Sequence, residues 1–269
     1  MESITSVNNQ HIKDIANLKQ KKYRTESGTF FAEGLRAVQE ALDYAELTDL
    51  FFTKTEEDKL NEILKNAEAK GVRLYCVDEK VMLKLSDTKT PQGVLAVIRM
   101  PEQSLQKLRP GTASDNNAPV IILDRIQDPG NLGTIIRTAD AVGALGIILL
   151  EGCVDVYSPK VVRASMGSLF HLPVVQDIFP EEALTWCYRH GYEPAATAMK
   201  GAANLYKADI SKKMAFIFGN EANGVTEELQ AAAETRLFIP MAGQAESMNV
   251  AMAAGIVLFE GLRQRKFIR

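Results

Sequence analysis

The sequence predicts an α/β protein in two parts: a small N-terminal α/β domain and a larger C-terminal α/β domain built on a parallel sheet. Three observations predict this. Apolar stretches of strand length alternate with helical patterns along most of the 269 residues. Pro, Gly and short polar residues interrupt the pattern between positions 100 and 118. Beyond that break, strands such as 120–123 are continuously apolar, which is typical of a parallel sheet covered on both faces.

The N-terminal domain is predicted to span residues 1–100, with a linker at 101–118. Expected strands lie at 29–32, 50–53, 73–77 and 93–99, and expected helices at 34–45, 56–70 and 79–85. Alternation of this kind indicates a small α/β domain.

The C-terminal domain is predicted to span residues 119–269. Expected strands lie at 120–124, 146–150, 194–199, 214–218 and 236–239, and expected helices at 131–142, 158–169, 181–190, 226–234 and 247–263. In such sheets ligands bind at the carboxyl ends of the strands. The loops that follow these strands are therefore the candidate functional segments.

Composition favours a folded protein in water. The chain is 46% hydrophobic and 24% charged, as is ordinary for globular domains. Its apolar runs are shorter than the roughly 20 residues that a membrane helix needs, and its polar start lacks the pattern of a secretory signal. We therefore expect a cytoplasmic protein that does not associate with a membrane.

The sequence predicts no metal site, and its net charge does not indicate a protein that coats nucleic acid. Cys76, Cys153 and Cys187 have no close spacing to one another or to the three histidines, so we expect free thiols and no metal site. The net charge of −3 argues against a protein that coats nucleic acid. Basic residues nevertheless gather at both ends, as Lys13, Lys19, Lys21, Lys22 and Arg24 and as Arg263, Arg265, Lys266 and Arg269.

The first candidate loop follows the strand at 120–124. Asn131 stands where a helix N-cap is expected, Gly130 and Gly133 permit close backbone approach, and Arg137 lies further along the helix. On spacing alone, a tight strand-to-helix turn with a surface arginine is the favoured interpretation.

The second loop follows the strand at 214–218. Gly219 and Gly224 bracket Glu221 where the backbone must turn, which suits a ligand pressed against main-chain groups. A phosphate cradle is a poor alternative because Glu221 would repel an anion and no Gly-Lys-Ser/Thr ending is present. A simple turn with a solvated glutamate remains equally compatible with these residues.

The third loop follows the strand at 236–239, and its Ile239-Pro240-Met241 leads to Glu246-Ser247-Met248-Asn249 before a long helix rich in Ala and Gly. A Ser-x-Asn pair at a helix entrance gathers hydrogen-bonding groups there. Simple capping of the helix by Ser247 is the structural alternative.

Together the three motifs, in this order, resemble those of the SpoU (TrmH-like) family of RNA ribose 2′-O-methyltransferases. The motifs are Asn131-x-Gly133-x-x-x-Arg137, Gly219-x-Glu221-x-x-Gly224, and Ile239-Pro240-Met241 with Glu246 to Ala251. The resemblance covers about residues 119–265, and residues 9–41 resemble the L30e-like substrate-binding domain of the family. Met248, Asn220 and Asn223 depart from the commoner residues; leucine to methionine conserves volume, so no loss of the site is expected.

The resemblance implies a trefoil-knotted SPOUT fold for the C-terminal domain, S-adenosylmethionine as cofactor, RNA as partner, and a homodimer. It implies cofactor contacts from main-chain groups at Thr197, Gly219, Ile239 and Met248. It implies catalytic or positioning roles for Arg137, Asn131, Glu221, Ser247 and Asn249. Without the resemblance, a solvated helix face is the favoured interpretation of the basic cluster near the N-terminus. With it, the cluster becomes a candidate RNA-binding surface, formed by Lys19, Lys21, Lys22 and Arg24.

Methyl transfer requires the ribose oxygen and the sulfonium methyl to be aligned, and one hydroxyl proton must leave. In the family the arginine at the position of Arg137 is proposed to act on that hydroxyl. A guanidinium is a poor base because its pKa lies above about 12. We therefore expect Arg137 to grip the adjacent phosphate, with deprotonation only if the site strongly lowers its pKa. Asn131 and Asn249 are assigned to positioning, and Glu221 to orienting Arg137 or neighbouring loops.

Three functional alternatives stay open. The expected substrate is 23S ribosomal RNA, with transfer RNA as the alternative. A non-catalytic RNA-binding or ribosome-assembly protein could keep the same fold, and calorimetry without cofactor binding would support it. A dinucleotide-dependent enzyme is disfavoured because no Gly-x-Gly-x-x-Gly follows any strand.

Overall fold

A computed structural model describes residues 1–111, 115–198, 201–244 and 247–266. The chain forms two compact units. The N-terminal unit comprises Met1–Glu102 and Tyr157–His171, and the C-terminal unit comprises Gln103–Val156 and Leu172–Arg269. The predicted α/β class with a parallel sheet is confirmed. Within the described ranges, no helix has both the length and the apolar character to cross a membrane.

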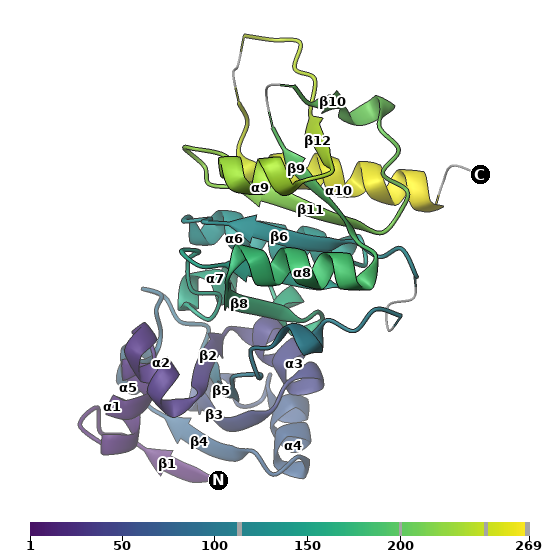
Figure 1. The fold of residues 1–269 in the computed structure, drawn as a ribbon. Helices are drawn as coiled ribbons and strands as arrows, with labels where there is room; N and C mark the ends of the chain where they lie inside the picture. Colours follow the sequence, from purple (N-terminus) through teal and green to yellow (C-terminus); the bar gives the residue numbers. More distant parts are fainter. Residues whose placement is uncertain (112–114, 199–200, 245–246, 267–269) are drawn as a thin grey trace. The chain divides into compact units, whose positions relative to one another are not determined.

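The N-terminal unit is built on a five-stranded sheet in the order β1-β4-β3-β5-β2 (Figure 1). Its strands are β1 (Glu2–Ile4), β2 (Thr29–Glu33), β3 (Leu47–Thr53), β4 (Arg73–Val77) and β5 (Val94–Arg99). Strand β5 is antiparallel to both β2 and β3, and the other pairs are parallel. Its helices are α1 (Gln10–Asn17), α2 (Lys21–Ser27), α3 (Leu35–Tyr44), α4 (Asn61–Ala69), α5 (Glu79–Leu85) and α7 (Pro159–Ala164).

The segment Tyr157–His171 packs within the N-terminal unit although it is far away in sequence. Phe30 of β2 is 1% exposed, and its ring lies 4.7 Å from the ring of Tyr157 and 6.3 Å from that of Phe170. Arg163 of α7 donates to Glu33 at 3.1 Å. The helix predicted at 158–169 ends at Ala164, because Met166 (φ +52°) and Gly167 (φ +95°) both adopt left-handed conformations that break the helical path.

The C-terminal unit is built on a seven-stranded, wholly parallel sheet in the order β10-β12-β9-β11-β6-β7-β8 (Figure 1). Its strands are β6 (Val120–Asp124), β7 (Gly146–Leu150), β8 (Val174–Ile178), β9 (Glu193–Thr197), β10 (Ala203–Asn204), β11 (Met214–Gly219) and β12 (Thr235–Phe238). Its helices are α6 (Pro129–Ala141), α8 (Pro180–His190), α9 (Glu227–Ala232) and α10 (Val250–Lys266).

Helices cover both faces of this sheet, which explains its continuously apolar strands. Every residue of β6, β7 and β11 is buried. In Figure 1, α8 and α9 lie in front of the sheet, and α6 and α10 lie behind it, where they pack against each other. Because all strands run the same way, the loops after β6, β9, β11 and β12 emerge at one edge of the sheet, which we call the carboxyl edge.

Candidate functional site

Glu221 joins the first two motif loops at the carboxyl edge. Its carboxylate accepts hydrogen bonds from the backbone N–H groups of Gln127 and Asp128, each at 3.2 Å. It also accepts from Nδ2 of Asn131 at 3.0 Å. Of the two partners expected for Glu221, the structure therefore shows the neighbouring loop and not Arg137.

Asn249 joins the third motif to the first. Its Nδ2 donates to Oδ1 of Asn131 at 2.9 Å. Its Oδ1 accepts from the backbone N–H groups of Ala251 at 2.9 Å and Met252 at 3.3 Å, and so caps α10. The chain Glu221–Asn131–Asn249 thus connects all three motifs through side-chain hydrogen bonds.

The helix caps differ from the sequence-based expectation at both helices. Helix α6 begins at Pro129, and Asp128 is its N-cap, since Oδ1 of Asp128 accepts from the backbone N–H of Asn131 at 2.8 Å. Asn131 lies inside the first turn, where its side chain is free to bridge Glu221 and Asn249. Ser247 is exposed and precedes the capping residue of α10.

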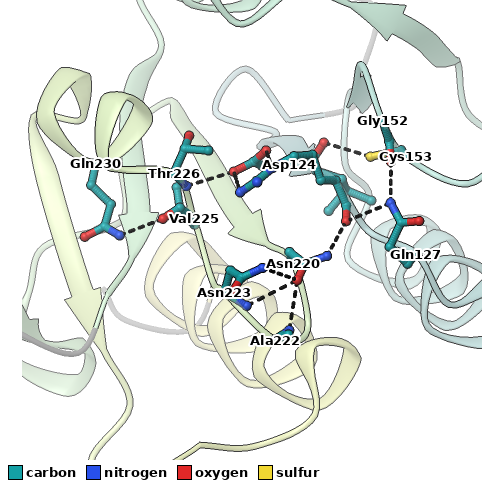
Figure 2. Close-up of polar contacts among 12 residues, drawn as sticks. Asp124, Gln127, Gly152, Cys153, Asn220, Ala222, Asn223, Val225, Thr226 and Gln230 are labelled. Carbon is teal, nitrogen blue, oxygen red and sulfur yellow. Dashed lines mark hydrogen bonds and ion pairs between the residues drawn. The ribbon is translucent and has the colours of Figure 1, made fainter.

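The loop between β11 and α9 is tied to β6 by a second set of contacts (Figure 2). The Nδ2 of Asn220 donates to the carbonyl of Arg125 at 2.9 Å, and the backbone N–H of Thr226 donates to Oδ2 of Asp124 at 2.8 Å. The carboxylate of Asp124 also accepts from Nε of Arg125 at 2.8 Å. The sequence predicted no role for these residues, although Asn220 was noted as a departure from the family pattern.

Gly219 is required by the loop that follows it. A Cβ placed there would lie 2.1 Å from the backbone carbonyl carbon of Gly224 and 2.1 Å from the backbone nitrogen of Val225. The loop closes on itself through a hydrogen bond from the N–H of Gly224 to the carbonyl of Asn220 at 2.8 Å. The predicted sharp turn is present, and the close backbone approach is made by the loop itself.

The four predicted cofactor positions lie around neighbouring strand ends. Thr197 ends β9, Gly219 ends β11 and Ile239 follows β12, and these three strands are adjacent in the sheet. Ile239 and Met248 are half-buried, and the hydroxyl of Thr197 donates to the carbonyl of Ile217 at 3.2 Å. Main-chain groups beside half-buried apolar side chains fit a nucleoside-bearing cofactor. Met199, Ala245 and Glu246, which the sequence analysis includes in these segments, lie outside the described residues.

Arg137 lies on the exposed face of α6. Among the described residues it has no hydrogen-bond or ion-pair partner. Its guanidinium is therefore available to an anion.

Electrostatics at the site favour an ionised Glu221. Partial burial raises the pKa of Glu221, but hydrogen bonds from Asn131, Asp128 and Gln127 outweigh this, and the net pKa is lowered. Nearby, burial raises the pKa of the Cys153 thiol to about 11, so this cysteine is protonated and unreactive at neutral pH. Across the described ranges, no group of three or more His, Cys, Asp and Glu side chains is arranged to hold a metal ion.

The four predicted RNA-binding residues differ in their exposure to solvent. Lys21 and Lys22 are exposed at the start of α2. Lys19 is half-buried and its Nζ donates to the carbonyl of Lys84 at 2.8 Å. Arg24 is only 3% exposed and its Nη1 donates to the carbonyl of Leu18 at 2.6 Å. The assignment of Arg24 to RNA is therefore corrected: its guanidinium is committed to the interior of the unit.

Comparisons with known proteins agree with this arrangement. The family model described as "SpoU rRNA Methylase family" matches residues 118–259, and the one described as "MRM3-like substrate binding domain" matches residues 9–96. A relative from Bacillus subtilis (strain 168), named 23S rRNA (guanosine(2553)-2′-O)-methyltransferase RlmP, is 36% identical over 259 residues, which are 96% of this chain and 98% of that protein.

Solved structures are similar over the whole chain. The AdoMet-bound rRNA methyltransferase from Sinorhizobium meliloti has a TM-score of 0.87 and 36% identity, covering 98% of each chain. The SpoU methyltransferase AviRb from Streptomyces viridochromogenes, in complex with the cofactor AdoMet, has a TM-score of 0.88 and 29% identity, covering 97% of this chain and 100% of that one. With its three motifs hydrogen-bonded at one edge of a parallel sheet, the chain belongs to the SpoU rRNA methylase family.

Proposed function

We propose that this protein transfers a methyl group from S-adenosylmethionine to a ribose 2′-hydroxyl of RNA, with 23S ribosomal RNA as its substrate. The observation that carries the proposal is the hydrogen-bonded chain Glu221–Asn131–Asn249, which brings the three motifs together at the carboxyl edge. The activity named for the Bacillus subtilis relative and the two AdoMet-bound structures of similar methyltransferases support the reaction and the substrate class. The three free cysteines fit a reducing, cytoplasmic location.

When bound, S-adenosylmethionine supplies the electrophilic methyl carbon. Main-chain groups at Thr197, Gly219 and Ile239 would hold the cofactor, and the side chains of Ile239 and Met248 would shield it from water. Glu221, Asn131 and Asn249 keep the three loops at fixed separations, so that the attack geometry is set before RNA arrives. Ser247, exposed beside Met248, completes the polar wall.

Arg137 orients the nucleotide. Its guanidinium offers a planar fork that matches a phosphate with two parallel hydrogen bonds. Gripping the phosphate next to the target ribose fixes the 2′-oxygen relative to the methyl group. Lys21 and Lys22 on α2 add phosphate contacts that carry affinity without base information.

A homodimer completes the site in this proposal, and the C-terminal fold is knotted as in the SPOUT class. Helix α10 exposes Met252 by 62% and Phe259 by 51%, with Ile256 half-buried between them. These apolar residues follow the i, i+4, i+7 spacing of one helix face. A second copy would cover this face, which lies on the helix that packs against α6 and its Arg137.

The test is incubation of the protein with methyl-labelled cofactor and separate pools of 23S ribosomal RNA and transfer RNA, followed by mapping of ribose methylation. We expect label at a single ribose of 23S ribosomal RNA. Label in transfer RNA would show that transfer RNA, and not 23S ribosomal RNA, is the substrate. Label in neither pool, with no cofactor binding, would favour a non-catalytic RNA-binding role.

A further inference from the structure

A buried carboxylate lies at the carboxyl edge without a role in the proposal so far. Asp124 ends β6, is 3% exposed, and is the register partner of Gly219 on β11. Its Oδ1 accepts from Nε of Arg125 at 2.8 Å, and its Oδ2 accepts from the backbone N–H of Thr226 at 2.8 Å. A buried carboxylate is costly unless it is paired and hydrogen-bonded. Both of its oxygens are used here.

Arg125 contacts both Asp124 and the start of the loop between β11 and α9. It adopts φ +55°, a left-handed conformation unusual for a residue with a side chain. In this conformation its side chain reaches Asp124 while its carbonyl accepts from Nδ2 of Asn220 at 2.9 Å (Figure 2). Such strain is typically held at functional sites by surrounding contacts.

Asn220 in turn shapes the loop from inside. Its Oδ1 accepts from the backbone N–H groups of Ala222 at 3.0 Å and Asn223 at 3.2 Å (Figure 2). The loop is therefore anchored to β6 at its start through Asn220 and at its end through Thr226. Glu221, which bridges to the β6–α6 loop, lies between the two anchors.

We infer that Asp124 and Asn220 are positioning residues that clamp the 220–226 loop to the end of β6 and thereby fix Gly219 and Glu221 for the cofactor. This inference rests on the proposed function, because it assigns the clamp to the site that binds S-adenosylmethionine. Asp124 acts through Thr226 and Arg125, and Asn220 acts through the Arg125 carbonyl.

Two single substitutions test the clamp. Asp124→Asn keeps the size of the side chain but removes the charge that pairs with Arg125. Asn220→Asp keeps the oxygen that accepts from Ala222 and Asn223 but removes the donor to the Arg125 carbonyl. For each variant we expect the Kd for S-adenosylmethionine, measured by calorimetry, to rise about tenfold or more. We expect KM for the cofactor to rise with it, and kcat at saturating cofactor to change less.

Glu193→Gln is the matched control for a purely structural effect. Glu193 begins β9 and so lies at the amino ends of the strands, away from the carboxyl edge. Its carboxylate accepts from Lys212 at 3.0 Å and from Thr235 at 2.7 Å. This substitution should lower the melting temperature and leave the Kd for the cofactor unchanged.

The outcomes distinguish a failure of the clamp inference from a failure of the proposed function. If both clamp variants lose melting temperature as the control does but bind cofactor within about twofold of the wild type, the inference is overturned. If Asp124→Asn does not fold, Asn220→Asp decides alone, since its side chain is only partly buried. If the wild-type protein binds no S-adenosylmethionine, the proposed function fails first, whatever the variants do.

Discussion

Gly219 ends β11 where the following loop folds back over it, and the backbone of Gly224 and Val225 leaves no space for a Cβ. Gly219→Ala should therefore lower the free energy of unfolding by about 2 to 3 kcal/mol through overpacking. Gly143→Ala is the control, because Gly143 has φ +64° but no heavy atom within 4 Å of a built Cβ. It should cost only about 1 kcal/mol of conformational strain. Equal losses in denaturant titrations would contradict the steric account.

The ionisation of Glu221 gives a prediction about pH. Its folded-state pKa is lowered below the ordinary value of 4.5, so its contribution to stability is present above that value and is lost as the pH falls through the folded-state pKa. In urea titrations from pH 7 to pH 3, the wild type should be more stable than Glu221→Gln near neutrality, and the difference should shrink below about pH 4.5. A difference that stays constant over this range would show that the charge of Glu221 contributes nothing.

The role of Arg137 depends on the shape of its side chain. Arg137→Lys keeps the charge and loses the planar fork. We expect kcat/KM for RNA to fall at least about tenfold, as for the loss of a bidentate contact worth roughly 1.4 kcal/mol or more. The Kd for S-adenosylmethionine should stay within about twofold of the wild type. Near-normal turnover would contradict the orienting role.

The sequence patterns identified the motif residues but not the residues that position them through hydrogen bonds. Asn131 was expected at the N-cap, but Asp128, followed by Pro129 at the first helical position, fits the capping preferences better. Asp124 gave no signal because its partner Thr226 is 102 positions away in sequence. Burial of Arg24 could not be foreseen either, since its partner is a backbone carbonyl.

At the scale of elements, prediction succeeded where packing imposes a strong pattern. Strands β6, β7 and β11 are buried on both faces and are continuously apolar, so their positions follow from the sequence. Strand β8 was missed because Gln176 and Asp177 interrupt its apolar pattern, as a strand at the outer edge of a sheet allows. Helix α1 was not predicted, and α2 was anticipated only as the solvated helix face that carries Lys19 to Arg24.

The exposed face of α10 gives a prediction about assembly. Phe259→Glu would place a charge within the proposed apolar contact, so we expect the dimer to dissociate at micromolar concentration. The mass in solution, measured by light scattering after size exclusion, should fall from two chains to one. Leu83→Glu is the control, since Leu83 is 52% exposed on α5 in the other unit. A wild type that is already a single chain would contradict the assembly proposal.

At the scale of the whole molecule, the alternation of strands and helices indicated two α/β parts, and the units divide between Glu102 and Gln103. The inclusion of Tyr157–His171 in the N-terminal unit has no sequence signal, because its helix looks like any crossover in the C-terminal sheet. Tertiary contacts place it, such as those of Phe30 with Tyr157 and Phe170 and of Arg163 with Glu33. A knot, which we propose for the C-terminal unit, would likewise depend on chain threading, which no local pattern reports.

The central claim is that three loops from distant parts of the sequence act as one cofactor site through Glu221, Asn131 and Asn249. A double-mutant cycle of Asn131→Ala and Asn249→Ala on the calorimetric Kd for S-adenosylmethionine tests it most directly. The account predicts that the two losses are not additive, with a coupling of about 1 kcal/mol or more, because either substitution already breaks the shared hydrogen bond. Additive losses, or wild-type affinity in the double variant, would contradict it.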